Sequence, residues 1–171
     1  MLTNRERMLY YWELRTRTDH ARRAWREAAH ALAGNDVDAF WYHIETFLSG
    51  AISVANVLWP SSKSNAAQKR AEDLRAALGV GADAPDGLRD VRNGFEHFDE
   101  RIDQWRVNST DHNFIDTNIS DPASLGGIDP GDIARNFNPD TSELAVFGKI
   151  TSVDAVLSEL AAVYAKVPKR Y

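Results

Sequence analysis

An arginine and a histidine lie five residues apart in the stretch RNGFEH, which runs from Arg92 to His97. Histidine exchanges a proton near neutral pH and can act as a general acid or base. Arginine can bind two oxygens of a phosphate at once and can stabilise negative charge that develops there. Asn93 lies four residues before His97, on the same face of a helix, and can orient a substrate by hydrogen bonds. These residue types are suited to acid–base chemistry beside an anionic group.

Two neighbouring side chains, Arg89 and Glu96, have supporting roles in this hypothesis. We expect both to contribute to substrate binding, because Arg89 adds a second guanidinium and Glu96 lies between the two ends of the motif. The alternative for Arg92 and Glu96 is an ordinary surface ion pair four residues apart on a helix, which contributes only a few tenths of a kcal/mol.

The stretch that contains this motif predicts an amphipathic helix from Asp86 to about Arg106. At about 100° per residue, its apolar side chains form one stripe roughly 100° wide. The stripe consists of Leu88, Val91, Phe95, Phe98, Ile102 and Trp105. A helix with one such apolar face needs other helices to bury it.

This predicted helix does not bring its own motif residues together. Arg92 and His97 would project about 140° apart on a straight helix. Two copies of the helix, paired about a two-fold axis, would present the arginine of one chain near the histidine of the other. We therefore expect a homodimer that forms through the Arg92–His97 helix.

Four further helices are predicted from apolar residues at spacings of three and four and from capping residues. We expect them at about 4–33, 37–59 and 66–78, and from Thr151 or Ser152 to about 167. The short connection between the first two implies an antiparallel pair. Gly50 and Ala51 in the second helix are small enough to let another helix approach closely.

The segment 107–150 has a different composition, rich in Gly, Asn, Asp, Ser and Pro. Two stretches in it look extended, 113–119 and 144–150, and we expect them to pair as an irregular hairpin. The sequence leaves open whether this insertion is a lid, a dimer arm or a simple loop. The predicted fold is one all-α domain over 1–171, an up-down four-helix bundle with one extra short helix and this insertion.

Composition excludes several classes of site. The 171-residue chain has no cysteine, so disulfides, thiolate zinc sites and thiol nucleophiles are excluded. It contains no phosphate-binding glycine loop, nucleophilic serine elbow or HExxH metal motif, and we expect neither a metal nor another cofactor. The longest uncharged run, 46–62, is too short and too interrupted to span a bilayer. We therefore expect a cytoplasmic protein without a membrane partner.

Charge is distributed unevenly along the chain. The net charge of −5 argues against a nucleic-acid binder that works by bulk charge alone. However, seven arginines face three acids between Arg5 and Arg26, whereas eight acids face two cations between Asp111 and Asp154. The arginine-rich helix is either a solvated surface or a surface that faces RNA, and the sequence alone does not decide between them.

The hexapeptide RNGFEH resembles the R-x4-6-H signature of the HEPN superfamily, in which a polar residue commonly follows the arginine. The same spacing also occurs at Arg15–His20, Arg23–His30 and Arg106–His112. Of these four matches, only RNGFEH has a polar Asn directly after its arginine and lies on a strongly amphipathic helix late in the bundle. The resemblance implies an all-helical fold for the frame of the chain but does not cover the insertion.

The resemblance also implies a function, because active HEPN proteins are metal-independent RNA endonucleases of toxin or defence systems. They form dimers with one composite site. Arg92 would then bind the phosphate, His97 would be the general base or acid, and Asn93 would orient the RNA. An antitoxin or a nucleotidyltransferase is the partner expected for such a toxin. The alternative from the residues themselves is a non-catalytic helical bundle that binds a protein or a nucleotide.

Overall fold

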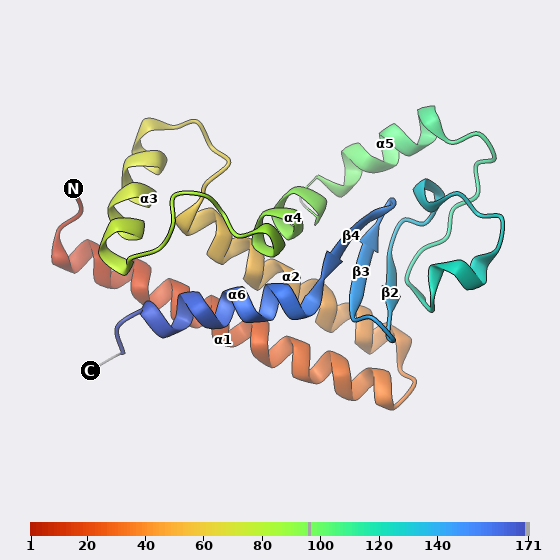
Figure 1. The fold of residues 1–171 in the computed structure, drawn as a ribbon, viewed down its shortest axis with the longest axis horizontal. Helices are drawn as coiled ribbons and strands as arrows, with labels where there is room; N and C mark the ends of the chain where they lie inside the picture. Colours follow the sequence, from red (N-terminus) through yellow and green to blue (C-terminus); the bar gives the residue numbers. More distant parts are fainter. Residues whose placement is uncertain (96, 170–171) are drawn as a thin grey trace.

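The structure is a computed structural model that describes residues 1–95 and 97–169, with the backbone alone for Arg92. Its first two helices, α1 (Asn4–Ala33) and α2 (Val37–Leu58), form an antiparallel pair that is the most extensive contact in the molecule (Figure 1). Thr3 and Glu6 form a capping box at the start of α1, and the Asp36 carboxylate caps α2. Both helices were expected from the sequence, and both are confirmed.

The contact between α1 and α2 is closest at Gly50. A Cβ atom at this position would lie 2.9 Å from both the Cβ of Ala21 and the carbonyl oxygen of Arg17. Atoms do not pack this closely, so the two helices can meet here only because residue 50 is glycine. The expected role of a small residue is therefore confirmed at this position.

Two more helices complete the core. The helix α3 (Asn65–Leu78) covers one end of α2, and the last helix, α6 (Val153–Lys166), lies across the α1–α2 pair (Figure 1). Both were predicted, and the cap of α6 is Ser152, whose hydroxyl accepts the N–H of Ala155. The largest fully buried side chains join all of these elements: Leu14, Phe40, Ile44, Phe47, Leu58, Leu74, Leu88, Val91, Phe137, Leu144 and Leu160.

The long amphipathic helix predicted around the motif is wrong as a continuous element. Residues in this region form two helices, α4 (Asp86–Phe95) and α5 (Phe98–Asn108). His97, between them, adopts the left-handed conformation with φ 63° and ψ 44°. A left-handed residue two positions after the last helical residue is a common way for a helix to end. Figure 1 shows α5 continuing away from the α1–α2 pair.

The two halves separate because their apolar residues pack against different partners. Leu88 and Val91 of α4 are fully buried in the core, beside α2 and α6. No residue of α5 is fully buried; its Phe98 and Trp105 instead contact aromatic side chains of the insertion. Because Phe98 and Trp105 pack outside the core, the apolar stripe is not buried in a single bundle.

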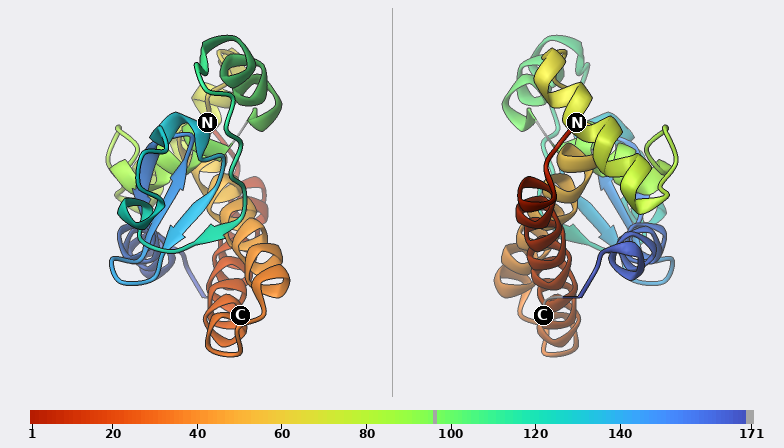
Figure 2. Two further views of the ribbon diagram at one scale, coloured as in Figure 1. Left: turned by 90° about the vertical axis from the view of Figure 1, so that its right-hand side faces the viewer. Right: turned by 90° about the vertical axis from the view of Figure 1, so that its left-hand side faces the viewer.

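The insertion contains a four-stranded sheet in the order β1–β2–β3–β4. The strands are short: β1 (Asn118–Ile119), β2 (Asn136–Asn138), β3 (Glu143–Val146) and β4 (Lys149–Ser152). β1 and β2 are parallel, whereas the other two pairs are antiparallel. Two single-turn helices, η1 (Pro122–Leu125) and η2 (Pro130–Asp132), lie between β1 and β2. Figure 2 shows the sheet beside the α1–α2 pair and on the same side as α6.

The predicted hairpin between 113–119 and 144–150 is wrong. The stretch 144–150 contains a hairpin of its own, in which Val146 pairs with Lys149 and the turn is made by Phe147 and Gly148. Both turn residues have positive φ, 45° and 75°, as a two-residue hairpin turn of type I′ requires. The phenylalanine at the first turn position concealed this turn, because glycine, asparagine or aspartate usually occupies it.

The fold is mostly helical, as predicted, but a mixed sheet makes the all-α description incomplete. Phe137 of β2 joins the two parts, because its ring contacts Phe40 and Trp25 at centroid distances of 4.9 and 6.0 Å. Across the described part of the chain, no helix combines the length and the apolar content needed to cross a membrane.

Candidate functional site

The junction between α4 and α5 presents the histidine of the motif at the surface. The side chain of His97 is 70% exposed, and its Nδ1 lies 3.6 Å from Oε1 of Glu100, an ion-pair distance beyond hydrogen-bond range. Because Nδ1 faces the carboxylate, the outer Nε2 is left for a substrate.

Asn93 lies in the last turn of α4, with its side chain exposed, and two cations approach it. The Arg101 guanidinium of α5 donates a hydrogen bond to the Asn93 carbonyl oxygen. Lys149, at the start of β4, lines with Asn93 a shallow cavity of about 340 Å³. The Nε of Arg101 is buried without a hydrogen-bond partner among the described residues. The structure thus places two cations beside the motif that the sequence did not identify.

The other predicted site residues have different outcomes. Arg89 forms ion pairs with Asp86 at 2.7 Å and with Asp90 at 3.7 Å, so carboxylates of its own helix offset its charge. Arg92 lies on α4, and its side chain is outside the described residues, as is all of Glu96. The roles predicted for Arg92 and Glu96 therefore stay predictions. Arg101 contacts the backbone of both Asn93 and His97, through its guanidinium and its own N–H respectively.

A carboxylate of α6 positions α4. Glu159 accepts the backbone N–H of Gly87 through Oε1 at 3.1 Å and that of Leu88 through Oε2 at 2.8 Å. These are N–H groups at the start of α4, where a helix lacks internal partners and favours negative charge. Gly87 favours this close approach, because a Cβ there would lie 2.9 Å from Oε2 of Glu159 and 3.1 Å from the backbone nitrogen of Val156. Glu159 therefore holds the N-terminus of α4 against α6, and this fixes the helix that carries Asn93 at its other end.

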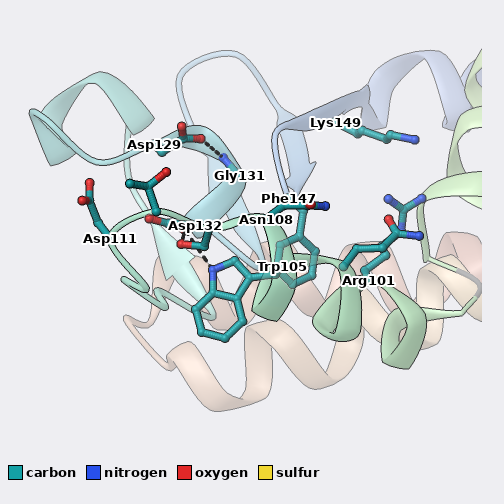
Figure 3. A pocket seen from close by; sticks show the side chains of 12 residues that line it. Arg101, Trp105, Asn108, Asp111, Asp129, Gly131, Asp132, Phe147 and Lys149 are labelled. Carbon is teal, nitrogen blue, oxygen red and sulfur yellow. Dashed lines mark hydrogen bonds between the residues drawn. The ribbon is translucent and has the colours of Figure 1, made fainter.

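A second cavity, of about 310 Å³, lies between α5, η2 and the β3–β4 turn (Figure 3). Trp105 and Phe147 line it, together with Arg101 of α5 and Lys149 of β4. Asp132 is only 2% exposed, and its Oδ1 accepts hydrogen bonds from Nε1 of Trp105 at 2.8 Å and from Oγ of Ser109 at 2.5 Å. The cavity therefore combines an aromatic wall with charged groups of both signs.

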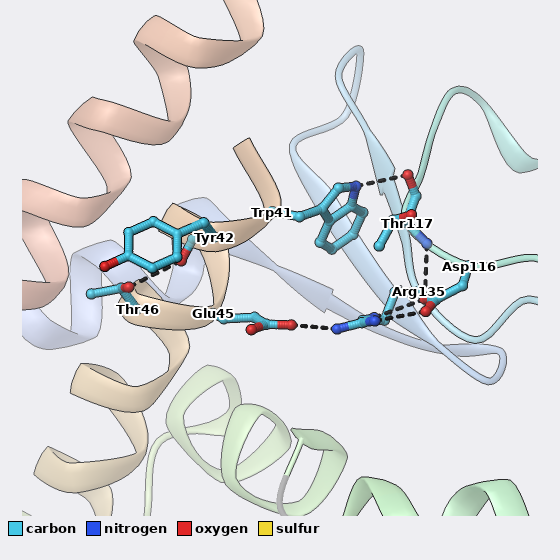
Figure 4. Close-up of polar contacts among 7 residues, drawn as sticks. All are labelled: Trp41, Tyr42, Glu45, Thr46, Asp116, Thr117 and Arg135. Carbon is cyan, nitrogen blue, oxygen red and sulfur yellow. Dashed lines mark hydrogen bonds and ion pairs between the residues drawn. The ribbon is translucent and has the colours of Figure 1, made fainter. Parts of the chain in front are cut away.

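A third cavity, of about 320 Å³, lies between α2 and the α4–α5 junction, with Phe95 and Phe98 in its wall. Arg135 closes it and forms ion pairs with Asp116 and Glu45, as Figure 4 shows. Hydrogen bonds from Arg135, together with its charge, lower the pKa of Asp116 from its ordinary value of 3.8. The same hydrogen bonds and the Asp116 charge raise the pKa of Arg135. Glu45 in the cavity wall and Asp116 beside it therefore offset the charge of Arg135.

Metal binding was also considered from the side chains. Among residues 1–95 and 97–169, no three His, Cys, Asp or Glu side chains gather closely enough to hold a metal ion.

A scan against protein-family models, a search of curated proteins and a search of solved structures each found nothing that matches this chain. The resemblance to the HEPN superfamily therefore stays a prediction from the sequence.

Sequence reasoning missed the cations that accompany the motif. Arg101 lies four residues after His97, one helical turn away, so its spacing was a usable signal. Lys149 had no such signal, because it lies more than fifty residues along the chain and only the sheet brings it to α4.

Proposed function

We propose that the protein is an RNA endonuclease that cuts at the α4–α5 junction by attack of the RNA's own 2′-hydroxyl. The observation that carries the proposal is the exposed imidazole of His97, which is backed by Glu100 and lies one turn before Arg101. This reaction needs an acid–base group beside cations, because a proton must leave the nucleophile while negative charge develops on the phosphate oxygens.

The reaction would proceed in one displacement. Nε2 of His97 removes the 2′-hydroxyl proton, the 2′-oxygen bonds to phosphorus, and the bond from phosphorus to the 5′-oxygen breaks. The leaving 5′-oxygen takes up a proton from solvent water, and His97 then returns its proton to the solvent, so the products are a 2′,3′-cyclic phosphate and a free 5′-hydroxyl. Arg101 and Lys149 would stabilise the negative charge that develops in the transition state. Arg92 would add to this by its place in the motif, and Asn93 would orient the RNA.

The test is incubation of the purified protein with a labelled structured RNA in excess EDTA. We expect cleavage with 2′,3′-cyclic phosphate ends and a loss of about a hundredfold or more in rate for His97→Ala. The matched control is His20→Ala, an exposed histidine of α1, which should cut at the parent rate. Absence of cleavage across several RNAs, or equal cleavage by His97→Ala, would overturn the proposal.

The proposal includes a HEPN-like bundle that dimerises through the α4–α5 region, so that two motifs form one composite site. It is supported by apolar side chains on α5 that the described chain leaves uncovered, Ile102 at 37% and Val107 at 73% exposure. Light scattering should give twice the chain mass of 19.1 kDa, and Ile102→Glu with Val107→Glu should return the monomer. A parent protein that is monomeric at high concentration would contradict dimerisation.

A second candidate function is a non-catalytic module that binds a protein or a nucleotide. The observation that favours it is α5 itself, which is held to the insertion by aromatic contacts and has no fully buried residue. An antitoxin or a nucleotidyltransferase would be a partner for this surface under either function. This candidate predicts no RNA turnover by the parent protein in the EDTA experiment, so the same measurement separates the two functions.

A further inference from the structure

The cavity between α5 and the β3–β4 turn has two chemically different ends. Arg101 and Lys149 lie at one end, whereas Asp111, Asp129 and Asp132 lie at the other, as Figure 3 shows. Its volume of about 310 Å³ is at the lower limit of small-molecule sites. A ligand that fits it must therefore be small and must carry an anionic group at one end and hydrogen-bond donors at the other.

Asp132 supplies a buried acceptor at the acidic end. Its Oδ1 is engaged by Trp105 and Ser109, but no donor and no cation contacts Oδ2 among the described residues. Asp132 as a residue is only 2% exposed, so its carboxylate is held in place while Oδ2 keeps the capacity to accept a hydrogen bond. Oδ2 is therefore an oxygen that can accept a hydrogen bond from a ligand N–H.

Two aromatic rings form the middle of the cavity. Trp105 is held in place by the hydrogen bond that its Nε1 donates to Asp132 and by an edge-on contact with Phe114 at a centroid distance of 4.9 Å. Phe147 has a φ of 45°, an unusual conformation for a bulky residue, and its N–H donates to the Ile133 carbonyl at 2.9 Å. Aromatic rings of this kind stack on nucleobases.

The basic end suits a phosphate. Lys149 contacts no carboxylate among the described residues, and Arg101 retains a buried Nε without a partner there. These are the same cations that approach Asn93 at the α4–α5 junction. A phosphate bound by them would therefore join the cavity to the proposed cleavage site.

We infer that this cavity binds the nucleobase next to the scissile phosphate and selects bases that carry an exocyclic amino group. Guanine, adenine and cytosine each offer an exocyclic amino N–H to Oδ2 of Asp132. Uracil has no amino group, and its one ring N–H, at N3, lies between two carbonyl oxygens that a carboxylate repels. The inference rests on the proposed function, which it deepens by naming the base preference of the nuclease.

The test is calorimetric binding of the four nucleoside 3′-monophosphates to the parent protein. We expect the three amino-bearing nucleotides to bind about tenfold or more tightly than uridine monophosphate. Asp132→Asn should reverse this order, because the amide can keep its oxygen toward Trp105 and turn an N–H toward the base, where it would pair with a uracil carbonyl. Equal binding of all four nucleotides, or binding of none, would overturn the inference.

Control variants separate this result from misfolding and from the nuclease proposal. Asp121→Asn, at the start of η1 and outside the cavity, should leave all four affinities unchanged. Lys149→Gln, at an exposed position, should weaken all four by a similar factor, so the inference stays testable if Asp132→Asn fails to fold. Base discrimination without RNA cleavage would support the base site and overturn the nuclease. RNA cleavage without base discrimination would support the nuclease and overturn the base site.

Discussion

Arg135 and Asp116 form a bidentate ion pair that joins the segment before β1 to the segment before β2. Nε of Arg135 donates to Oδ1 of Asp116 at 2.7 Å, and Nη2 donates to Oδ2 at 2.6 Å. The remaining guanidinium nitrogen contacts Glu45 of α2. Arg135 directly precedes β2, so one side chain ties the parallel edge of the sheet to the helical core.

Replacing this arginine with lysine tests the ion pair. Arg135→Lys keeps the charge but cannot contact both oxygens of Asp116 in parallel, so we expect a loss of about 2 kcal/mol of unfolding free energy. Urea denaturation measures it. The control is Arg26→Lys, an exposed arginine of α1, for which we expect a change within about 0.5 kcal/mol. Equal effects of the two substitutions would mean that the paired geometry contributes no stability.

The same pair predicts a loss of stability in acid. The pKa of Asp116 is lowered in the folded protein, so its contribution is fully present above the ordinary value of 3.8 and is lost as the pH falls through the lower folded value. Thermal unfolding of the parent and of Asp116→Asn, from about pH 6 to about pH 3, measures the difference. The gap between the two proteins should be constant near pH 6 and narrow below about pH 4. A gap that stays constant into acid would contradict the assignment.

The contact between Glu159 and α4 predicts a local effect at the candidate site. Glu159→Ala removes the acceptor of two helix-terminal N–H groups, and we expect it to cost about 2 kcal/mol and to expose the amides of α4 to exchange. Glu159→Gln keeps an acceptor without the charge and should cost less. Hydrogen exchange followed by mass spectrometry resolves α4 from α1. Glu27→Ala, an exposed site on α1, is the control. Exchange that speeds equally in both helices would indicate a global effect instead.

Substitutions of His97, whose backbone is left-handed, can test stability and activity independently. Glycine adopts this conformation without strain, so His97→Gly should raise the unfolding free energy by about 0.5 kcal/mol while removing the proposed acid–base group. His97→Val also lacks the imidazole, but its branched side chain is strained there and should cost about 1 kcal/mol. Chemical denaturation compares the two. The same stability for glycine and valine would show that residue 97 is not left-handed.

The local pattern of the sequence was enough to predict the regular helices. The bounds of α1, α2, α3 and α6 agree with expectation within about two residues, because apolar spacing and capping side chains act within a few turns of each other. Gly50 was recognised as a close contact for the same reason, since its size limits how near a helix can come. These features depend on neighbours along the chain.

The interruption at His97 could not be predicted in this way. The apolar spacing from Leu88 to Trp105 continues through it, and only packing shows that α4 belongs to the core while α5 belongs to the insertion. The β1–β2 pairing is equally non-local, since Asp116 and Arg135 are nineteen residues apart and favour the parallel arrangement by an ion pair across the sheet.

By itself, the sequence determined the helical frame, the absence of thiol chemistry and the motif that runs from Arg92 to His97. The tertiary structure alone decided that His97 would be exposed beside Glu100, and that Lys149 would reach Asn93 from a distant strand. The physical reason is range. Helices form from interactions between near neighbours, whereas a site for a charged substrate is assembled from residues whose proximity exists only after the chain has folded.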